Sequence, residues 1–368
     1  MRLIKGMSIP FLTLLILSGN FCYGEVTTEK PYEKGVKYGS VGEFDKARKE
    51  FEKALELEPY SVAYKRHLRA IEYVNKQKVK TDAAISYFKE IEYYNKKQYH
   101  KAINESNNAL TINPMFAEAY INRGISYRSI GEYDKAISDF NEALKIDPKL
   151  YEIYVYRGWT YESQGRPDDA ISDFNTALKI NPKYPDAYFL RGATLDIDKR
   201  EYDRAIADYS KAIELNPMEA RYYSFRGNTL NLIKQYDKAI SDFSKAIELN
   251  PDDPQTYLNR GHTYYRQRLY KKAINDYSKA IDINPKFVEA YIERGNAYHK
   301  QGQYDEAISD FNKAMDMDPS YIWAYNNRGD AYDKKGDLEK ACYDWKKVCE
   351  LGICRRWTLI NRIRCLGK

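Results

Sequence analysis

The sequence AEAYINRGISYRSIGEYDKAISDFNEALKIDPKL, residues 117–150, decides the fold of this chain. In its first half, aromatic and small residues recur at i, i+4 and i+7, the spacing of one face of a helix: Tyr120, Gly124 and Tyr127. A second stripe with the same spacing consists of Ala136, Phe140 and Ala143. Gly131 between the stripes tolerates the positive φ of a turn, and Pro148 ends the second helix because proline lacks an N–H. The stretch therefore predicts a hairpin of two helices.

The same stretch recurs along the 368-residue chain. An Arg-Gly pair occurs seven times, at intervals of 34 residues with one interval of 35, beginning at Arg123, Arg157, Arg191, Arg226, Arg260, Arg294 and Arg328. Prolines keep the same interval from Pro114 to Pro319. Such a period predicts stacked helical hairpins, in which each repeat buries its apolar face against its neighbours.

The repeat resembles the tetratricopeptide repeat, a helix-turn-helix of 34 residues. The family's aromatic, glycine, tyrosine, alanine, aromatic, alanine and proline positions fall on Tyr120, Gly124, Tyr127, Ala136, Phe140, Ala143 and Pro148. Arg123 departs from the pattern, because the family has an aliphatic residue there. The resemblance implies an all-α, right-handed superhelical solenoid of about nine hairpins with a C-terminal cap. It also implies a scaffold that holds protein partners on the concave side of its first helices and is not an enzyme.

The repeat frame divides the chain into five segments. They are a signal peptide at 1–24, a first repeat at 28–61, a linker helix with a basic elbow at 62–82, eight repeats at 83–353, and a capping segment at 354–368. The repeat that begins at residue 83 is degenerate. Glu90 stands where glycine is expected, and Ser106 stands where the second helix should carry an aromatic residue.

The N-terminus has the features of an export signal. Arg2 and Lys5 precede an apolar stretch, Ile9 to Leu17, and small residues follow before a cleavage point after Gly24. The apolar stretch is shorter than the roughly 20 residues that cross a bilayer. We therefore expect an exported protein, periplasmic or extracellular. The alternative is a chain that keeps this segment as an N-terminal membrane anchor.

Charge and motifs exclude several classes of function. The chain carries a formal net charge of +6, and removal of residues 1–24 takes away two basic residues and leaves +4. This excess is spread along the chain, whereas a nucleic-acid-binding protein concentrates it on one face. The four histidines lack metal-ligand spacing, and no phosphate loop or nucleophile elbow is present. We expect no nucleic-acid partner, no cofactor, no metal site and no catalytic residue.

An acidic residue follows each repeated arginine after sixteen positions, or seventeen across the longer repeat. The pairs include Arg123 with Asp139, Arg157 with Asp173, Arg260 with Asp276, and Arg294 with Asp310. In the two early repeats the pairs are Lys34 with Glu50 and Lys89 with Glu105. We interpret them as ion pairs that link the two helices of one repeat, or one repeat to the next. A row of cations for anionic ligands is the alternative, and the accompanying acid argues against it.

A second set of first-helix residues lies one step round from the packing stripe and is the candidate partner-binding groove. It contains Ile121, Ile125, Val155, Trp159, Phe189, Asn228, His262, Asn296, Asn326 and Asp330. The apolar members predict a stretch around Trp159 that holds a hydrophobic side of a partner. The polar members predict hydrogen bonds to extended backbone or to sugar. The alternative for the apolar members is that they pack against neighbouring repeats.

Two functions are compatible with this groove. The first is a scaffold or adaptor that is exported to the cell envelope and binds proteins or peptides. The alternative is a periplasmic scaffold that binds polysaccharide and assists glycan export.

Four cysteines lie in the last 27 residues of the chain: Cys342, Cys349, Cys354 and Cys365. In an exported protein such a cluster predicts two disulfides. Cys342 and Cys349 fall on one expected helix, about 10 Å apart at 1.5 Å per residue, which is too far for a bond between them. Two connectivities remain: 342–354 with 349–365, or 342–365 with 349–354.

Overall fold

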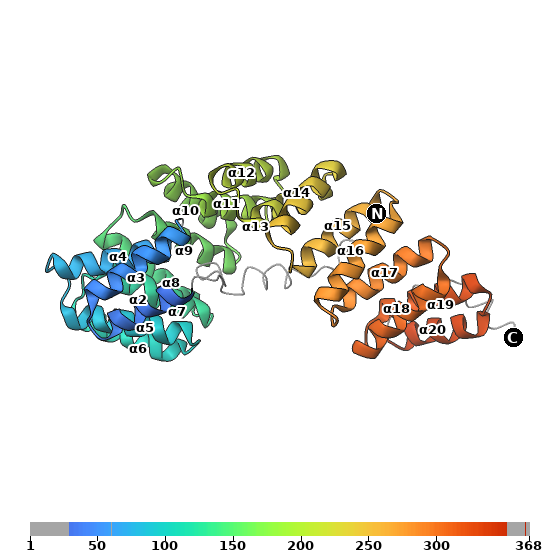
Figure 1. The fold of residues 1–368 in the computed structure, drawn as a ribbon, viewed down its shortest axis with the longest axis horizontal. Coiled ribbons are helices and arrows are strands. Elements are labelled where there is room, and N and C mark those ends of the chain that lie inside the picture. Colours follow the sequence, from blue (N-terminus) through green and yellow to red (C-terminus); the bar gives the residue numbers. More distant parts are fainter. Residues whose placement is uncertain (1–28, 60, 352–364, 366–368) are drawn as a thin grey trace. The chain divides into compact units, whose positions relative to one another are not determined.

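The computed structural model describes residues 29–59, 61–351 and 365 (Figure 1). The predicted signal peptide, residues 1–24, lies outside this part of the chain, as does most of the predicted capping segment at 354–368. The described residues form nineteen helices and no strand, as the repeat predicts. None of these helices is long and apolar enough to cross a membrane.

The chain divides into two compact units, residues 1–200 and 201–368, which we call the N-terminal unit and the C-terminal unit. The helices of the N-terminal unit are α2 (Glu29–Ser40), α3 (Phe44–Leu57), α4 (Val62–Asn75), α5 (Thr81–Asn95), α6 (Tyr99–Ile112), α7 (Ala117–Ser129), α8 (Tyr133–Ile146), α9 (Tyr151–Ser163), α10 (Pro167–Ile180) and α11 (Pro185–Ile197). Those of the C-terminal unit are α12 (Tyr202–Leu215), α13 (Ala220–Leu232), α14 (Tyr236–Leu249), α15 (Pro254–Arg266), α16 (Tyr270–Ile283), α17 (Val288–Lys300), α18 (Tyr304–Met317), α19 (Ile322–Lys335) and α20 (Leu338–Glu350).

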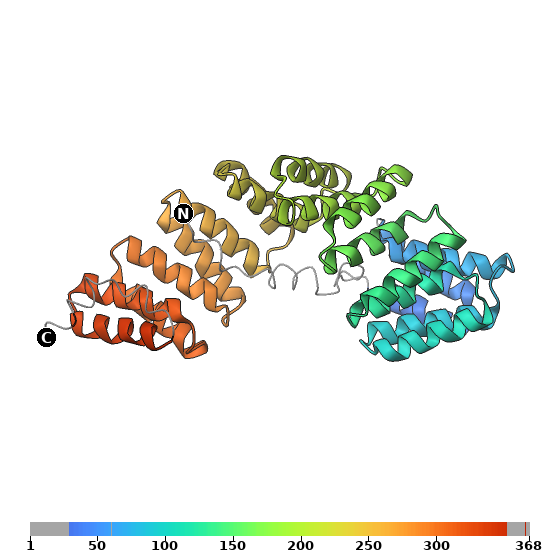
Figure 2. The ribbon, with the colours of Figure 1, turned by 180° about the vertical axis from the view of Figure 1, so that it is seen from behind.

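Hairpins stack in order within each unit. In the N-terminal unit α5 pairs with α6, α7 with α8 and α9 with α10, and the second helix of each pair packs on the first helix of the next. In the C-terminal unit the pairs are α13 with α14, α15 with α16, α17 with α18, and α19 with α20. Figure 2 shows the same succession of helices from behind. The structure therefore has the predicted architecture of a solenoid of helical hairpins.

The close approach of the two helices in a hairpin explains the glycine of the repeat. A Cβ atom added to Gly124 would lie 2.7 Å from the ring of Phe140, and one added to Gly261 would lie 2.6 Å from the ring of Tyr277. Real Cβ atoms essentially never come this close to another atom. The glycine and the aromatic ring thus fit each other, and this fit fixes how the helices cross.

The segment at 62–82 departs from the hairpin pattern. Its helix α4 packs mainly on α3, whereas α5 packs mainly on α2 and contacts α4 less extensively. Tyr64, Ala70 and Ile71 of α4 are buried, so α4 belongs to the core and is not an exposed linker. The turn after α4 includes Gln77, which has a positive φ of 56°. This turn returns the chain to the regular array at α5.

A disulfide joins the last hairpin to the C-terminal segment. Cys342 of α20 is bonded to Cys365, with the two Cα atoms 5.7 Å apart. Cys349 is also disulfide-bonded. Cys354 lies outside the described residues. The Cys342–Cys365 bond belongs to the second of the two predicted connectivities and is incompatible with the first.

Candidate partner-binding face

The repeated arginines are fully engaged inside the array. Arg123 of α7 donates from Nε and Nη2 to the two carboxylate oxygens of Asp139 on α8, at 2.8 and 2.6 Å. Its Nη1 donates to Oδ1 of Asn107 on the preceding hairpin, at 2.7 Å. The other pairs with the same geometry are Arg157–Asp173, Arg226–Asp242, Arg260–Asp276, Arg294–Asp310 and Arg328–Asp344.

The sequence left open whether the pairs link the two helices of one repeat or link successive repeats. In the structure each arginine of these pairs does both, because it binds the aspartate of its own repeat and also reaches a side chain of the previous repeat. Hydrogen bonds to Asp173 raise the pKa of Arg157, whereas burial raises the pKa of Asp139. The arginines of these six pairs therefore hold the array together and are not a surface for anionic ligands. In the first repeat, Glu50 accepts instead from Lys53 of its own helix, at 2.6 Å.

The apolar half of the predicted groove is buried. The prediction that these side chains are open to a partner is wrong for Ile121, Val155, Trp159 and Phe189, because each is at most 5% exposed. Ile125 is half-buried. The alternative interpretation, packing against neighbouring repeats, fits this burial. Trp159 in addition carries the guanidinium of Arg128 over its ring, 3.2 Å from the centroid, so its face is not available to a sugar.

Helix α4 covers the first-helix face of the N-terminal unit. From α4, Arg69 donates from Nε to Glu118 on α7 at 2.5 Å and from Nη2 to Glu152 on α9 at 2.6 Å. Both glutamates are buried, and each is the second residue of its repeat. One arginine of the inserted helix thus bridges the first helices of two successive repeats.

Two further side chains of α4 point into the same face. Arg66 is 1% exposed and donates to the hydroxyl of Tyr156 at 3.2 Å, with its guanidinium 5.5 Å from the ring centroid. Nδ1 of His67 lies 2.8 Å from the hydroxyl of Tyr87 on α5, and burial lowers the pKa of this histidine. Because these groups are buried and hydrogen-bonded, α4 closes this part of the face to other molecules.

The degenerate repeat contributes to the same closed region. Glu90 of α5 is buried and accepts from Asn122 Nδ2 at 2.6 Å and from Ser126 Oγ at 3.1 Å, both on α7. Burial raises the pKa of Glu90 to about 7, and the charge of Arg66 opposes this rise. Glutamate fits here because Ser106 replaces the aromatic ring that would otherwise occupy the space beside residue 90.

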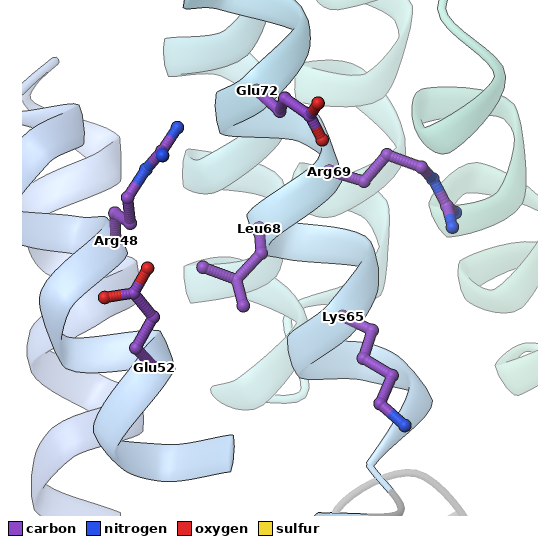
Figure 3. A pocket seen from close by; sticks show the side chains of 6 residues that line it. All are labelled: Arg48, Glu52, Lys65, Leu68, Arg69 and Glu72. Carbon is purple, nitrogen blue, oxygen red and sulfur yellow. The ribbon is translucent and has the colours of Figure 1, made fainter. Parts of the chain in front are cut away.

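An open cleft of about 340 Å³ separates α3 from α4 (Figure 3). It is lined by Arg48, Glu52, Lys65, Leu68, Arg69 and Glu72. The lining carries both signs of charge, and Figure 3 shows the guanidinium of Arg69 extending away from α3. The side chains therefore do not converge on one ligand chemistry, and we do not regard the cleft as a site.

The polar members of the predicted groove lie on the first helices of the C-terminal unit. Asn228, His262, Asn296 and Asn326 are half-buried, and Asp330 is exposed. Nδ2 of Asn327 donates to Oδ1 of Asn296 at 2.8 Å, and the Asn296 amide donates to Glu293 at 3.4 Å. No described helix lies over this face in the way that α4 covers the N-terminal one.

Two glutamates on α17 were not among the predicted site residues. Glu289 and Glu293 are half-buried, and burial raises the pKa of both carboxyl groups. Nε2 of His262 lies 3.9 Å from Glu293, but burial lowers the pKa of His262 to about 4, so this histidine is neutral at neutral pH. The repeat alignment could have indicated these two residues. Glu289 and Glu293 occupy the same repeat positions as Glu118 and Asn122 of the N-terminal unit.

The described residues contain no group of three or more histidine, cysteine or carboxylate side chains placed to hold a metal ion. The polar residues that we expected on the face of the C-terminal unit are amides, a carboxylate and one neutral imidazole. Amides donate and accept hydrogen bonds, whereas carboxylates accept them.

Family models match most of the array. A model described as "TPR repeat" matches residues 227–267, 270–302 and 295–336. Two models described as "Tetratricopeptide repeat" match 117–150 and 151–184, and 32–61, 185–217 and 324–351. The matched residues make up more than half of the chain. No curated protein is similar enough in sequence to count as a match.

Solved structures of the same architecture include three bacterial proteins. The C-terminal part of a TPR repeat-containing protein from Cytophaga hutchinsonii has a TM-score of 0.55 and 20% identity, covering 66% of this chain and 98% of that one. PilF from Pseudomonas aeruginosa has a TM-score of 0.51 and 20% identity, with coverage of 56% and 94%. A tetratricopeptide repeat protein from Parabacteroides merdae has a TM-score of 0.50 and 20% identity, with coverage of 68% and 97%. At these identities the likeness concerns the fold alone.

Proposed function

The chain belongs to the tetratricopeptide-repeat family, and from that premise we propose that it is a non-catalytic scaffold that holds a protein partner on the C-terminal unit. Tetratricopeptide repeats are an architecture for protein and peptide binding. The face that we assign to the partner consists of the first helices α13, α15, α17 and α19.

The observation that carries this proposal is the difference between the two units. In the N-terminal unit, α4 already occupies the first-helix face through Arg69, Glu118 and Glu152. In the C-terminal unit the corresponding face presents half-exposed amides and carboxylates, Asn296 and Glu293 among them. A partner would add hydrogen bonds where these side chains remain accessible.

We further propose that the protein works in the cell envelope after export. Two features support this location. Residues 1–24 have the charge and hydropathy pattern of an export signal. The disulfide between Cys342 and Cys365 belongs to an oxidising compartment such as the periplasm.

Site-specific photo-cross-linking in cells tests the proposed function. A benzophenone amino acid would replace Asn296 or Asp330 on the proposed face, and Lys313 on the second helix α18 would serve as the control position. We expect a discrete protein adduct from the two face positions and none from the control. Equal labelling from all three positions, or polysaccharide as the sole captured material, would show that the face does not hold a protein partner.

A further inference from the structure

The contact between α4 and its neighbours shows what kind of side chain the first helices of this array accept. Arg66 and Arg69 lie three residues apart on α4, so they project from one side of that helix. Arg69 contacts the second residue of two repeats, Glu118 and Glu152, and Arg66 contacts the sixth residue of one repeat, Tyr156. An arginine-bearing helix is therefore already seated on this face within the chain.

The same two repeat positions carry acids in the C-terminal unit. Glu289 is the second residue and Glu293 is the sixth residue of the repeat that begins at 288. Among the described residues, neither forms an ion pair with lysine or arginine, and the basic side chain that lies within 4 Å of Glu293 is the neutral His262. A half-buried carboxylate without a counter-ion is costly to keep ionised, so a cation at this place would be bound favourably.

His262 carries another buried polar atom without a partner at this place. Its Nε2 atom is buried and has no hydrogen-bond partner among the described residues, although it faces Glu293. A guanidinium has five N–H groups to donate, and carboxylate oxygens accept them. Glu289 and Glu293, four residues apart on α17, together match the donors of one arginine side chain.

An exposed aromatic ring occupies the second position of the next repeat. Trp323 is 39% exposed on α19, one repeat beyond Glu289. Indole rings bind cations on their faces, as Trp159 does with Arg128 in the N-terminal unit. Trp323 thus offers an exposed aromatic ring at the equivalent position one repeat beyond Glu289.

We propose that the C-terminal unit recognises an arginine-bearing segment of its protein partner, with Glu289 and Glu293 binding the guanidinium. This inference rests on the proposed function and names the chemistry of the partner. The chain has a net charge of +6, so a basic segment is repelled by the molecule as a whole and attracted only by local acidic surface. We therefore expect an arginine-bearing segment to bind at the acidic surface of Glu289 and Glu293 and not elsewhere on the chain.

A peptide titration tests the inference. The probe is a fluorescein-labelled synthetic peptide of residues 61–76, the chain's own example of an arginine-bearing helix, compared with a version in which Arg66 and Arg69 are replaced by alanine. The receptor is the purified chain, in which the N-terminal face is already occupied by α4. Binding is followed by fluorescence anisotropy at low and at physiological salt concentrations.

The receptor variants are Glu289→Gln with Glu293→Gln, and a matched control, Glu214→Gln with Glu248→Gln. The control changes the net charge by the same amount, on exposed residues of the second helices α12 and α14 that pair with Lys211 and Lys245. We expect the first variant to weaken peptide binding by about tenfold or more and the control by less than about twofold. Removal of the peptide's two arginines should have an effect as large as that of the first variant.

Three results would overturn the inference: no saturable binding to the parent chain, equal affinity of the two peptides, or equal loss in both receptor variants. Circular dichroism and thermal unfolding of each variant establish that the fold is intact. The proposed function fails separately, if no protein is cross-linked from Asn296 or Asp330. If a protein is cross-linked there equally well in the Glu289→Gln, Glu293→Gln chain, the scaffold function stands and the arginine chemistry is wrong.

Discussion

Replacing Arg69 by methionine should release α4 from the N-terminal unit. Arg69 is 22% exposed, and the side chains of its partners Glu118 and Glu152 are 0% and 3% exposed, so the substitution leaves two buried carboxylates without their counter-ion. At an effective dielectric constant of about 20, opposite charges 4 Å apart attract by about 4 kcal/mol. Removing one partner of a buried ion pair costs about 3–5 kcal/mol, and we expect a loss in this range.

The loss should depend on pH in a defined direction. Burial raises the pKa of Glu118 above 4.5, and Arg69 is the strongest influence that lowers it. Without Arg69 the folded-state pKa rises further. A carboxyl group whose pKa is higher in the folded state favours folding while it is protonated, and this contribution is lost as the pH rises through the folded-state pKa. The destabilisation by Arg69→Met should therefore be smallest below about pH 4.5 and larger at neutral pH.

Hydrogen exchange followed by mass spectrometry measures the effect locally. A loss of about 3 kcal/mol in the free energy of opening corresponds to at least a hundredfold faster exchange of the α4 amides. The amides of α16 in the C-terminal unit serve as the internal control and should not change. The triple variant Arg69→Met, Glu118→Gln, Glu152→Gln should recover much of the protection, because it removes the buried charges. Exchange of α4 within threefold of the parent, or a deficit independent of pH, would refute the reasoning.

Three further predictions concern stability. Gly261→Ala should lower the free energy of unfolding by about 1–3 kcal/mol, because its Cβ would lie 2.6 Å from Tyr277, and urea denaturation with Lys271→Ala on the exposed side of α16 as a mild control checks this. Arg260→Lys should cost about 1–2 kcal/mol in the same assay, because lysine cannot reproduce the two-point contact with Asp276, and an equal cost for Lys271→Arg on the surface would contradict it. Glu90, whose pKa burial raises to about 7, should make the parent lose stability as the pH rises from 5 to 8, since the protonated form is favoured in the folded state. Denaturation of Glu90→Gln across this range should show a flatter dependence, and parallel curves would count against the buried carboxyl.

The hairpins could be predicted from the sequence because their determinants are local. Gly124 and Phe140 lie in one repeat, and their contact follows from helix spacing and side-chain size alone. The pairing of Arg123 with Asp139 was also visible, because the two residue types keep a fixed separation in repeat after repeat. The repeats of this one chain could thus be compared with each other, position by position, as homologous sequences usually are.

The role of α4 could not be predicted from local sequence spacing. The sequence indicates a helix near residues 62–75, and the structure has one there. Its partners, however, lie 49 and 83 residues further along, at Glu118 and Glu152. The helical period says which side of α7 and α9 faces outward, but it does not say that another segment of the chain covers that side. Trp159 and Val155 were likewise expected in an open groove and are buried, Trp159 with Arg128 over its ring.

The two irregularities of the sequence belong to one structural feature. The extra helix α4 brings the buried cation Arg66 into the array, and the degenerate repeat brings the buried acid Glu90, whose pKa responds to that cation. A regular repeat has glycine at the position of Glu90 and could not place a carboxyl group there. Glu90 instead of glycine and Ser106 instead of an aromatic residue thus lie in the region that α4 closes, where Glu90 accepts hydrogen bonds from Asn122 and Ser126 of α7. In the C-terminal unit no such compensation is built into the described residues, and the acids at Glu289 and Glu293 remain without a lysine or arginine partner. The N-terminal unit thus pairs the acids of its first helices with an arginine of its own, whereas those of the C-terminal unit fit the arginine that we propose a partner supplies.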